Sequence, residues 1–147
     1  MTTRPCTSTR SRQLPLKLLL VDDSPDVLHD LQLLLELSGE MKIVGQTDNG
    51  FEAVTLAARL LPDVILMDLE LSGQDGFEAT RQIKSQQSAP QVIILSMHAS
   101  PVDRERARAS GADEFVVKGS SYELLRNAIL GTGETPDPLN NHTKEKT

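Results

Sequence analysis

Short apolar runs alternate with segments of helical periodicity along most of this 147-residue chain. Each run is rich in Leu, Ile and Val and has the length of a buried strand rather than of a helix. The intervening segments repeat apolar residues three and four positions apart and end near Gly or Pro. This alternation predicts a parallel sheet with helices on both faces. We expect strands at 16–21, 41–45, 63–67, 91–95 and 113–117 and helices at 25–38, 50–61, 77–86, 101–110 and 121–129.

The length suits one domain, and its core must be aliphatic because the chain has three Phe, one Tyr and no Trp. The segments at both ends are rich in polar residues and Pro, which cannot support a packed core. We therefore expect a disordered arm at residues 1–13, a folded domain at 14–131 and a polar tail or truncated linker at 132–147.

Charge and cysteine content exclude several classes of protein. The formal net charge is −6, and residues 18–131 carry 9 basic and 18 acidic side chains, which argues against direct nucleic-acid binding. Cys6 is the only cysteine, so an intrachain disulfide is excluded and a reducing compartment is indicated. No apolar run approaches the roughly 18–20 residues that span a membrane. With no secretory signal recognised, we expect a cytoplasmic protein without membrane contact.

Polar side chains stand where four of the five predicted strands end. Asp22 and Asp23 follow the first strand, Asp68 the third, Ser96 the fourth and Lys118 the fifth. The carboxyl ends of parallel strands meet at one edge of the sheet, where such folds bind ligands. Each residue alone has an ordinary explanation as a cap, loop or solvated side chain. Their occurrence at equivalent positions is far more specific and predicts one shared site.

The chemistry of this cluster suits magnesium and a phosphoryl group. Carboxylates at Asp22, Asp23 and Asp68 repel one another, and a hard divalent cation relieves that repulsion. Mg²⁺ prefers a few carboxylates together with waters and phosphoryl oxygens, whereas no calcium-binding loop motif is present. An aspartate can accept a phosphoryl group as a nucleophile, and a lysine such as Lys118 can neutralise the charge that it brings.

Taken together, these motifs resemble the receiver domain of bacterial response regulators, in the CheY-like superfamily. The resemblance covers residues 16 to about 130, and the ending Val-Val-Lys-Gly-Ser-Ser is most similar to receivers of the NarL/FixJ type. It implies a flavodoxin-like, three-layer, doubly wound α/β fold whose five parallel strands have the order 2-1-3-4-5, with five helices. The segments that carry it are Leu-Leu-Leu-Val-Asp22-Asp23-Ser, Asp63-Val-Ile-Leu-Met-Asp68-Leu, Asp75-Gly76, Ile-Ile-Leu-Ser96-Met and Gly111-Ala-Asp-Glu-Phe115-Val-Val-Lys118-Gly119.

The resemblance also implies a role for each residue of the cluster. Asp68 would take a phosphoryl group from a sensor histidine kinase or a phosphotransfer protein. Mg²⁺ would be held by Asp23, Asp68 and the backbone carbonyl of Glu70, with Asp22 acting nearby. In the same family pattern, Ser96 and Lys118 would bind the phosphoryl oxygens, and Phe115 would be the aromatic residue that moves inward when Ser96 shifts.

Signal output is expected on the face formed by the fourth helix, the last strand and the last helix, which could also support a homodimer. The fourth helix is weakly apolar, with Val102 and Ala107 as its main buried candidates, so it is a good candidate for the moving element. The chain departs from the family pattern at Leu71-Ser72 and at Lys118-Gly119, where the family usually has Met-Pro and often Lys-Pro. These departures concern the lifetime of the phosphoryl group and the size of the switch.

Three alternatives remain open on the sequence. The chain could be the N-terminal receiver fragment of a NarL/LuxR-type DNA-binding regulator, since only a short segment follows Leu130. A phosphatase of the haloacid dehalogenase type also uses an aspartate nucleophile, but its Asp-x-Asp motif after the first strand is missing. A pseudo-receiver that binds partners without phosphorylation is disfavoured by the intact Asp23, Asp68 and Lys118.

Overall fold

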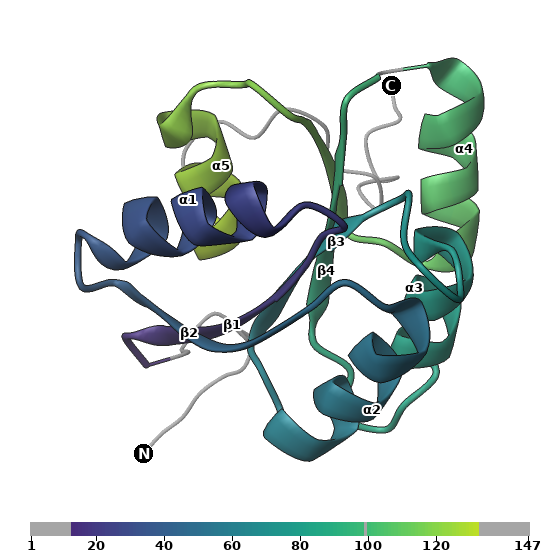
Figure 1. Cartoon of the computed structure of the whole chain (residues 1–147), viewed down its shortest axis with the longest axis horizontal. Helices are drawn as coiled ribbons and strands as arrows, with labels where there is room; N and C mark the ends of the chain where they lie inside the picture. Colours follow the sequence, from purple (N-terminus) through teal and green to yellow (C-terminus); the bar gives the residue numbers. More distant parts are fainter. Residues whose placement is uncertain (1–12, 99, 133–147) are drawn as a thin grey trace, which may run out of the picture.

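A five-stranded parallel sheet forms the centre of the computed structural model, which describes residues 13–98 and 100–132 (Figure 1). The strand order is β2-β1-β3-β4-β5, which confirms the predicted flavodoxin-like order. The central strand β3 is buried at all five of its positions. The strands are β1 (Leu16–Val21), β2 (Met41–Thr47), β3 (Val64–Asp68), β4 (Gln91–Ser96) and β5 (Glu114–Val117).

Helices cover both faces of the sheet and divide the core into two parts (Figure 1). Because successive strand residues point to opposite faces, Leu18 and Leu20 pack toward one core and Leu19 toward the other. The first core lies under α1 and α5, and the second lies under α2, α3 and α4. The helices are α1 (Pro25–Glu36), α2 (Gly50–Leu60), α3 (Gly76–Lys84), α4 (Pro101–Ser110) and α5 (Tyr122–Leu130).

A polar side chain caps the start of each of these helices. The capping residue has extended backbone angles, and its side-chain oxygen accepts a hydrogen bond from a backbone N–H in the first turn. This satisfies one of the donors that a helix start leaves without a partner. Ser120 and Ser121 are both possible caps of the last helix on the sequence, and the structure selects Ser121. The caps are Ser24, Asn49, Asp75, Ser100 and Ser121.

The second strand differs from its prediction. β2 is predicted to end at Gly45 and to be shorter than the others, but it continues to Thr47 and is the longest strand described. Thr47 pairs with Val21, and its carbonyl oxygen accepts a hydrogen bond of 3.0 Å from the Asp22 N–H. Backbone pairing with β1 therefore extends the strand past the point where its apolar residues stop. Its place at the edge of the sheet is confirmed.

The fourth helix has the predicted bounds but not the predicted buried face. Ala107 is fully buried as expected, whereas Val102 is 67% exposed, so its assignment to the core was wrong. Val102 precedes Ala107 by five residues, which is about 140° around a helix. The second side chain that α4 buries is Ser110, three residues after Ala107. The helix therefore rests on two small side chains.

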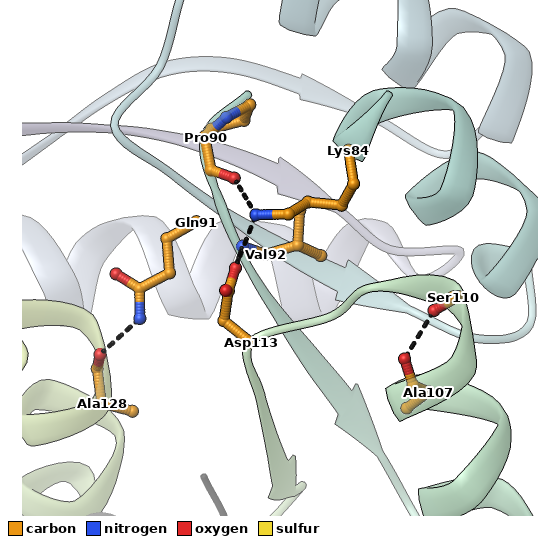
Figure 2. A network of polar contacts seen from close by, with 8 residues as sticks. All are labelled: Lys84, Pro90, Gln91, Val92, Ala107, Ser110, Asp113 and Ala128. Atoms are coloured by element: carbon orange, nitrogen blue, oxygen red, sulfur yellow. Dashed lines mark hydrogen bonds and ion pairs between the residues drawn. The ribbon is translucent and has the colours of Figure 1, made fainter. Parts of the chain in front are cut away.

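A network of polar contacts closes the amino edge of β4 and β5 (Figure 2). The Lys84 ammonium, from the end of α3, donates to the Pro90 carbonyl oxygen at 2.8 Å and to Asp113 Oδ2 at 2.9 Å. The same carboxylate accepts a hydrogen bond of 2.8 Å from the Val92 N–H. Gln91 donates to the Ala128 carbonyl oxygen and so joins β4 to α5. These contacts fix two helices to the edge of the sheet opposite the predicted site.

Two predictions concern segments that this structure covers only in part. The arm at 1–13 and the tail at 132–147 lie outside the described residues except for Gln13 and Thr132. Within 13–98 and 100–132, no helix has the length and apolar character needed to cross a membrane.

Removing the Lys84 ammonium should destabilise the fold. We expect Lys84→Met to lower the free energy of unfolding by about 1–2 kcal/mol, because Asp113 loses a half-buried ionic partner. Arg81→Met on the same helix is the control, since Arg81 is more than half exposed. Urea denaturation of both variants measures the difference. Equal losses would show that the amino-edge network adds no stability.

Glu114 should make stability depend on pH. It is 9% exposed, Oε1 has no hydrogen-bond partner, and burial together with the charge of Asp113 raises its pKa to about 7. Since the folded state holds this proton more tightly than the unfolded state, the stabilisation is complete below the unfolded pKa. It is lost as the pH rises through about 7.

We therefore expect Glu114→Gln to be more stable than the parent chain at pH 8, with a smaller difference at pH 5. Thermal unfolding of both proteins across this range measures the effect, and Glu123→Gln on the exposed start of α5 is the control. A gap between Glu114→Gln and the parent that does not change with pH would contradict the assignment.

Candidate functional site

Four strand ends bring the predicted polar residues to one edge of the sheet. Asp68 is the last residue of β3 and pairs in register with Leu95, and Ser96 is the last residue of β4. Asp22 directly follows β1, and Lys118 directly follows β5. Asp68 and Ser96 are 8% and 7% exposed, so both are buried at the floor of this edge.

Lys118 joins two of the carboxylates. Its Nζ lies 2.8 Å from Asp22 Oδ2 and 3.3 Å from Asp68 Oδ1. Its backbone N–H donates to the Ser96 carbonyl oxygen at 2.7 Å, which fixes the start of its side chain against β4. One ammonium therefore links the ends of β1, β3 and β5 and brings Asp22, Asp68 and Lys118 together.

The site carries more negative than positive charge. Burial raises the pKa of the Asp68 carboxyl, the charge of Asp22 raises it further, and Lys118 only partly opposes these effects. Burial alone would lower the pKa of the Lys118 amine, but its contacts with Asp22 and Asp68 outweigh burial and raise it. Two carboxylates that share one ammonium leave a site that attracts a further cation.

A pocket of about 320 Å³ opens above Asp68. Asp68, Ser96 and Lys118 line it together with Glu70, which the sequence placed among the metal ligands. Asp68 Oδ1 accepts a hydrogen bond of 2.9 Å from the Leu69 N–H, which orients the carboxylate. The Asp68 carboxylate is thus held in one orientation and faces a pocket that is open to solvent.

Only some of the four expected metal ligands lie together in the pocket. Asp23 is exposed and, like Asp22, is not among the residues that line the pocket. Within residues 13–98 and 100–132, no three His, Cys, Asp or Glu side chains are spaced to hold a metal ion. Asp22 instead pairs with Lys118 and accepts a hydrogen bond of 2.9 Å from the Ser24 N–H. The oxygen donors suit Mg²⁺ chemically, because it needs only one or two carboxylates and retains waters.

Ser96 and Phe115 lie on the neighbouring strands β4 and β5. The Ser96 hydroxyl accepts a hydrogen bond of 3.2 Å from the His98 N–H. Phe115 lies on the neighbouring strand, is 1% exposed, and packs in the core that lies under α2, α3 and α4. The Arg104 guanidinium of α4 lies 5.0 Å from the centre of its ring. Phe115 is therefore in contact with α4 through Arg104.

Sequence reasoning missed three further charged residues of the pocket. Asp75, Asp103 and Arg106 line it beside Asp68. The sequence marks Asp75 only as part of a motif, and it favours a solvated face for the arginines of α4. The available signal was that Asp103 and Arg106 lie three apart, on one side of a helix that begins just beyond the end of β4.

Comparison with known proteins identifies the family of this chain. The family model for the response regulator receiver domain matches residues 18–130. The transcriptional regulatory protein LiaR of Bacillus subtilis is 36% identical over 114 residues, which is 78% of this chain and 54% of LiaR. The chain spans 29% to 57% of the length of the first curated relatives that it matches, the shortest share being that of a protein-glutamate methylesterase from Methanospirillum hungatei.

Two solved receiver structures resemble the fold closely. The signal receiver domain of the putative response regulator NarL from Mycobacterium tuberculosis is 29% identical with a TM-score of 0.77, over 81% of this chain and 96% of that one. The receiver domain of a sensor histidine kinase from Pseudomonas aeruginosa, with magnesium in its active-site cleft, is 29% identical with a TM-score of 0.72, over 80% and 98%. The chain therefore belongs to the response regulator receiver domain family, and it resembles receivers of the NarL/LuxR type.

Proposed function

We propose that Asp68 is the phosphoacceptor of this receiver and takes its phosphoryl group from a phosphohistidine on a sensor histidine kinase or phosphotransfer protein. The observation that carries this proposal is the buried, oriented Asp68 carboxylate at the floor of an open pocket. A carboxylate oxygen attacks phosphorus, and the bond between phosphorus and the imidazole nitrogen breaks. The nitrogen keeps the electron pair, and because the second ring nitrogen carries a proton, the histidine leaves as a neutral imidazole.

Lys118 and Ser96 are proposed to bind the transferred group. Lys118 already lies 3.3 Å from Asp68 Oδ1, so its ammonium can neutralise a phosphoryl oxygen without a large movement. The Ser96 hydroxyl lines the same pocket and can donate a hydrogen bond to another of these oxygens. Both residues act by positioning and by charge, which is most of what phosphoryl transfer requires.

Magnesium is proposed as the cofactor, held by Asp23, Asp68 and the Glu70 carbonyl oxygen, with Asp22 nearby. Two buried carboxylates that share one ammonium support this choice, since burial and the charge of Asp22 raise the pKa of Asp68 and a cation would relieve both effects. When bound, Mg²⁺ would neutralise oxygens of the reacting phosphoryl group and of its acceptor. Asp23 must turn inward to reach it, and its exposure leaves that side chain free to rotate.

The output is proposed to pass through the face formed by α4, β5 and α5, toward a partner, an output domain or a second copy of the chain. The small contact area of α4 supports this, since the helix buries only Ala107 and Ser110. The receiver itself would bind neither nucleic acid nor membrane and would work in the cytoplasm. We assign it no enzymatic turnover beyond transfer from small phosphodonors and autodephosphorylation.

The second candidate function is that of the N-terminal part of a NarL/LuxR-type DNA-binding regulator. It is favoured by the similarity to LiaR, of which the chain spans 54%. An aspartate-nucleophile phosphatase is the weakest alternative. Repeated turnover of a generic phosphate ester would support it, whereas a receiver should not turn over such an ester.

Asp68→Asn should abolish phosphorylation. Incubation of the parent chain with acetyl phosphate and Mg²⁺ should add one phosphoryl group, because Asp68 is the one buried carboxylate among the described residues that line the pocket. Intact-mass spectrometry should detect this adduct in the parent and in Asp48→Asn, which changes an exposed acid outside the pocket. The adduct should be absent in Asp68→Asn and after addition of EDTA. An unmodified parent chain under every condition would refute the proposed reaction.

The same substitution should stabilise the metal-free protein. Asp68→Asn removes a buried charge that Asp22 repels, so we expect its melting temperature to rise by a few degrees in EDTA. Mg²⁺ should then raise the melting temperature of the parent chain more than that of the variant. Differential scanning fluorimetry measures all four states. A variant that melts below the parent in EDTA would show that Asp68 is not under electrostatic strain.

A further inference from the structure

Arg106 places a second permanent cation at the pocket above Asp68. It extends from α4, and its guanidinium carbon lies 4.2 Å from the centre of the Phe77 ring on α3. Arg106 and Phe77 both line the pocket that contains Asp68, Ser96 and Lys118. The guanidinium is thus held at the pocket by an aromatic face.

The three arginines of α4 have different surroundings. Arg108 makes two hydrogen bonds to the Glu105 carboxylate, and Arg104 lies over Phe115. Arg106 is exposed, and within the described part of the chain the Phe77 ring is the partner that the structure records for it. Its five N–H donors therefore remain available to an anion that enters the pocket.

Once a phosphoryl group is transferred to Asp68, the added negative charge requires a further cationic hydrogen-bond donor. Lys118 already serves two carboxylates, at 2.8 Å and 3.3 Å. Transfer replaces the single charge of Asp68 with a group that carries about two negative charges and three acceptor oxygens. A guanidinium can bind two such oxygens at once through parallel hydrogen bonds, and an ammonium cannot.

We propose that Arg106 binds the phosphoryl group on Asp68 as a second cation and thereby ties α4 to the acceptor. This inference rests on the proposed function of Asp68. The stacking on Phe77 keeps the guanidinium at the pocket before transfer, and the charge-assisted hydrogen bonds are the stronger contact after it. Ser96 and Lys118 belong to the ends of strands, so Arg106 gives the phosphoryl group a direct contact with the helix itself.

Beryllofluoride, a tetrahedral mimic of the phosphoryl group, provides the test. Calorimetric titration with Mg²⁺ alone, and then with beryllofluoride at saturating Mg²⁺, would use the parent chain, Arg106→Gln, Arg106→Lys and Arg108→Gln. We expect Arg106→Gln to bind beryllofluoride about tenfold more weakly, which corresponds to about 1.4 kcal/mol. Its affinity for Mg²⁺ should stay equal or rise, because a positive charge has been removed near the carboxylates.

The control variants separate charge from shape. Arg106→Lys should lose part of the beryllofluoride affinity, since it keeps the charge but not the planar fork. Arg108→Gln should match the parent, because Arg108 pairs with Glu105 and does not line the pocket. Beryllofluoride affinity of Arg106→Gln equal to that of the parent would overturn the inference.

Loss of both Mg²⁺ and beryllofluoride affinity in Arg106→Gln would also overturn it, because it would indicate a structural role for Arg106. A parent chain that binds neither Mg²⁺ nor beryllofluoride would refute the proposed function, and the inference would fall with it. The parent chain thus tests the site, and the difference between parent and variant tests Arg106.

Discussion

The arrangement of the strand ends at the site depends on the contact of one ammonium with two buried carboxylates. Lys118 bonds to Asp22 and Asp68 and so joins the ends of three strands at the site edge. The two carboxylates still outnumber the ammonium, and burial together with the charge of Asp22 raises the pKa of Asp68 despite the contact with Lys118. A buried charge without full compensation costs stability, and a protein retains it where the charge is used. The shortage of positive charge is therefore the property that favours a further cation at the site and supports the proposed Mg²⁺.

Both ends of the strands carry lysine and aspartate side chains, but the two clusters differ in whether their charges are fully paired. At the amino edge, Lys84 and Asp113 satisfy each other and also bind backbone groups of Pro90 and Val92 (Figure 2). At the carboxyl edge, Lys118 is shared, and a pocket of about 320 Å³ stays open. The closed edge anchors α3 and the start of β5, so the sheet can hold the charged cluster at its other end. A site that acts through positioned charges requires a rigid frame. Here the sheet is that frame, and the charges at one end of its strands are not fully paired.

Strand ends could be predicted from the sequence because each apolar run stops at a polar residue. Asp22, Asp68, Ser96 and Lys118 were placed at one edge by that rule, and the bounds of α4 followed from Ser100-Pro101 and Gly111. The strand order came from the resemblance, since no local pattern encodes which strands pair. β2 was predicted too short because backbone pairing, and not apolar content, extends it to Thr47. Val102 was misjudged because helix rotation relative to the sheet depends on tertiary packing, and for the same reason the contact of the exposed Arg106 with Phe77 could not be predicted.

Switching requires contacts that differ between the two states, and this limits which residues can drive it. A shift from 1:99 to 99:1 requires about 5.5 kcal/mol of differential interaction. Lys118 contacts Asp68 before transfer, so it changes little and discriminates weakly between the states. The Ser96 hydroxyl accepts from the His98 N–H, and Arg106 stacks on Phe77, so both can make new bonds to a phosphoryl group. Charge-assisted hydrogen bonds contribute about 1.5–3 kcal/mol each, so two or three of them reach the required range. α4 buries only two small side chains, so the proposed movement of this helix would disrupt little packing.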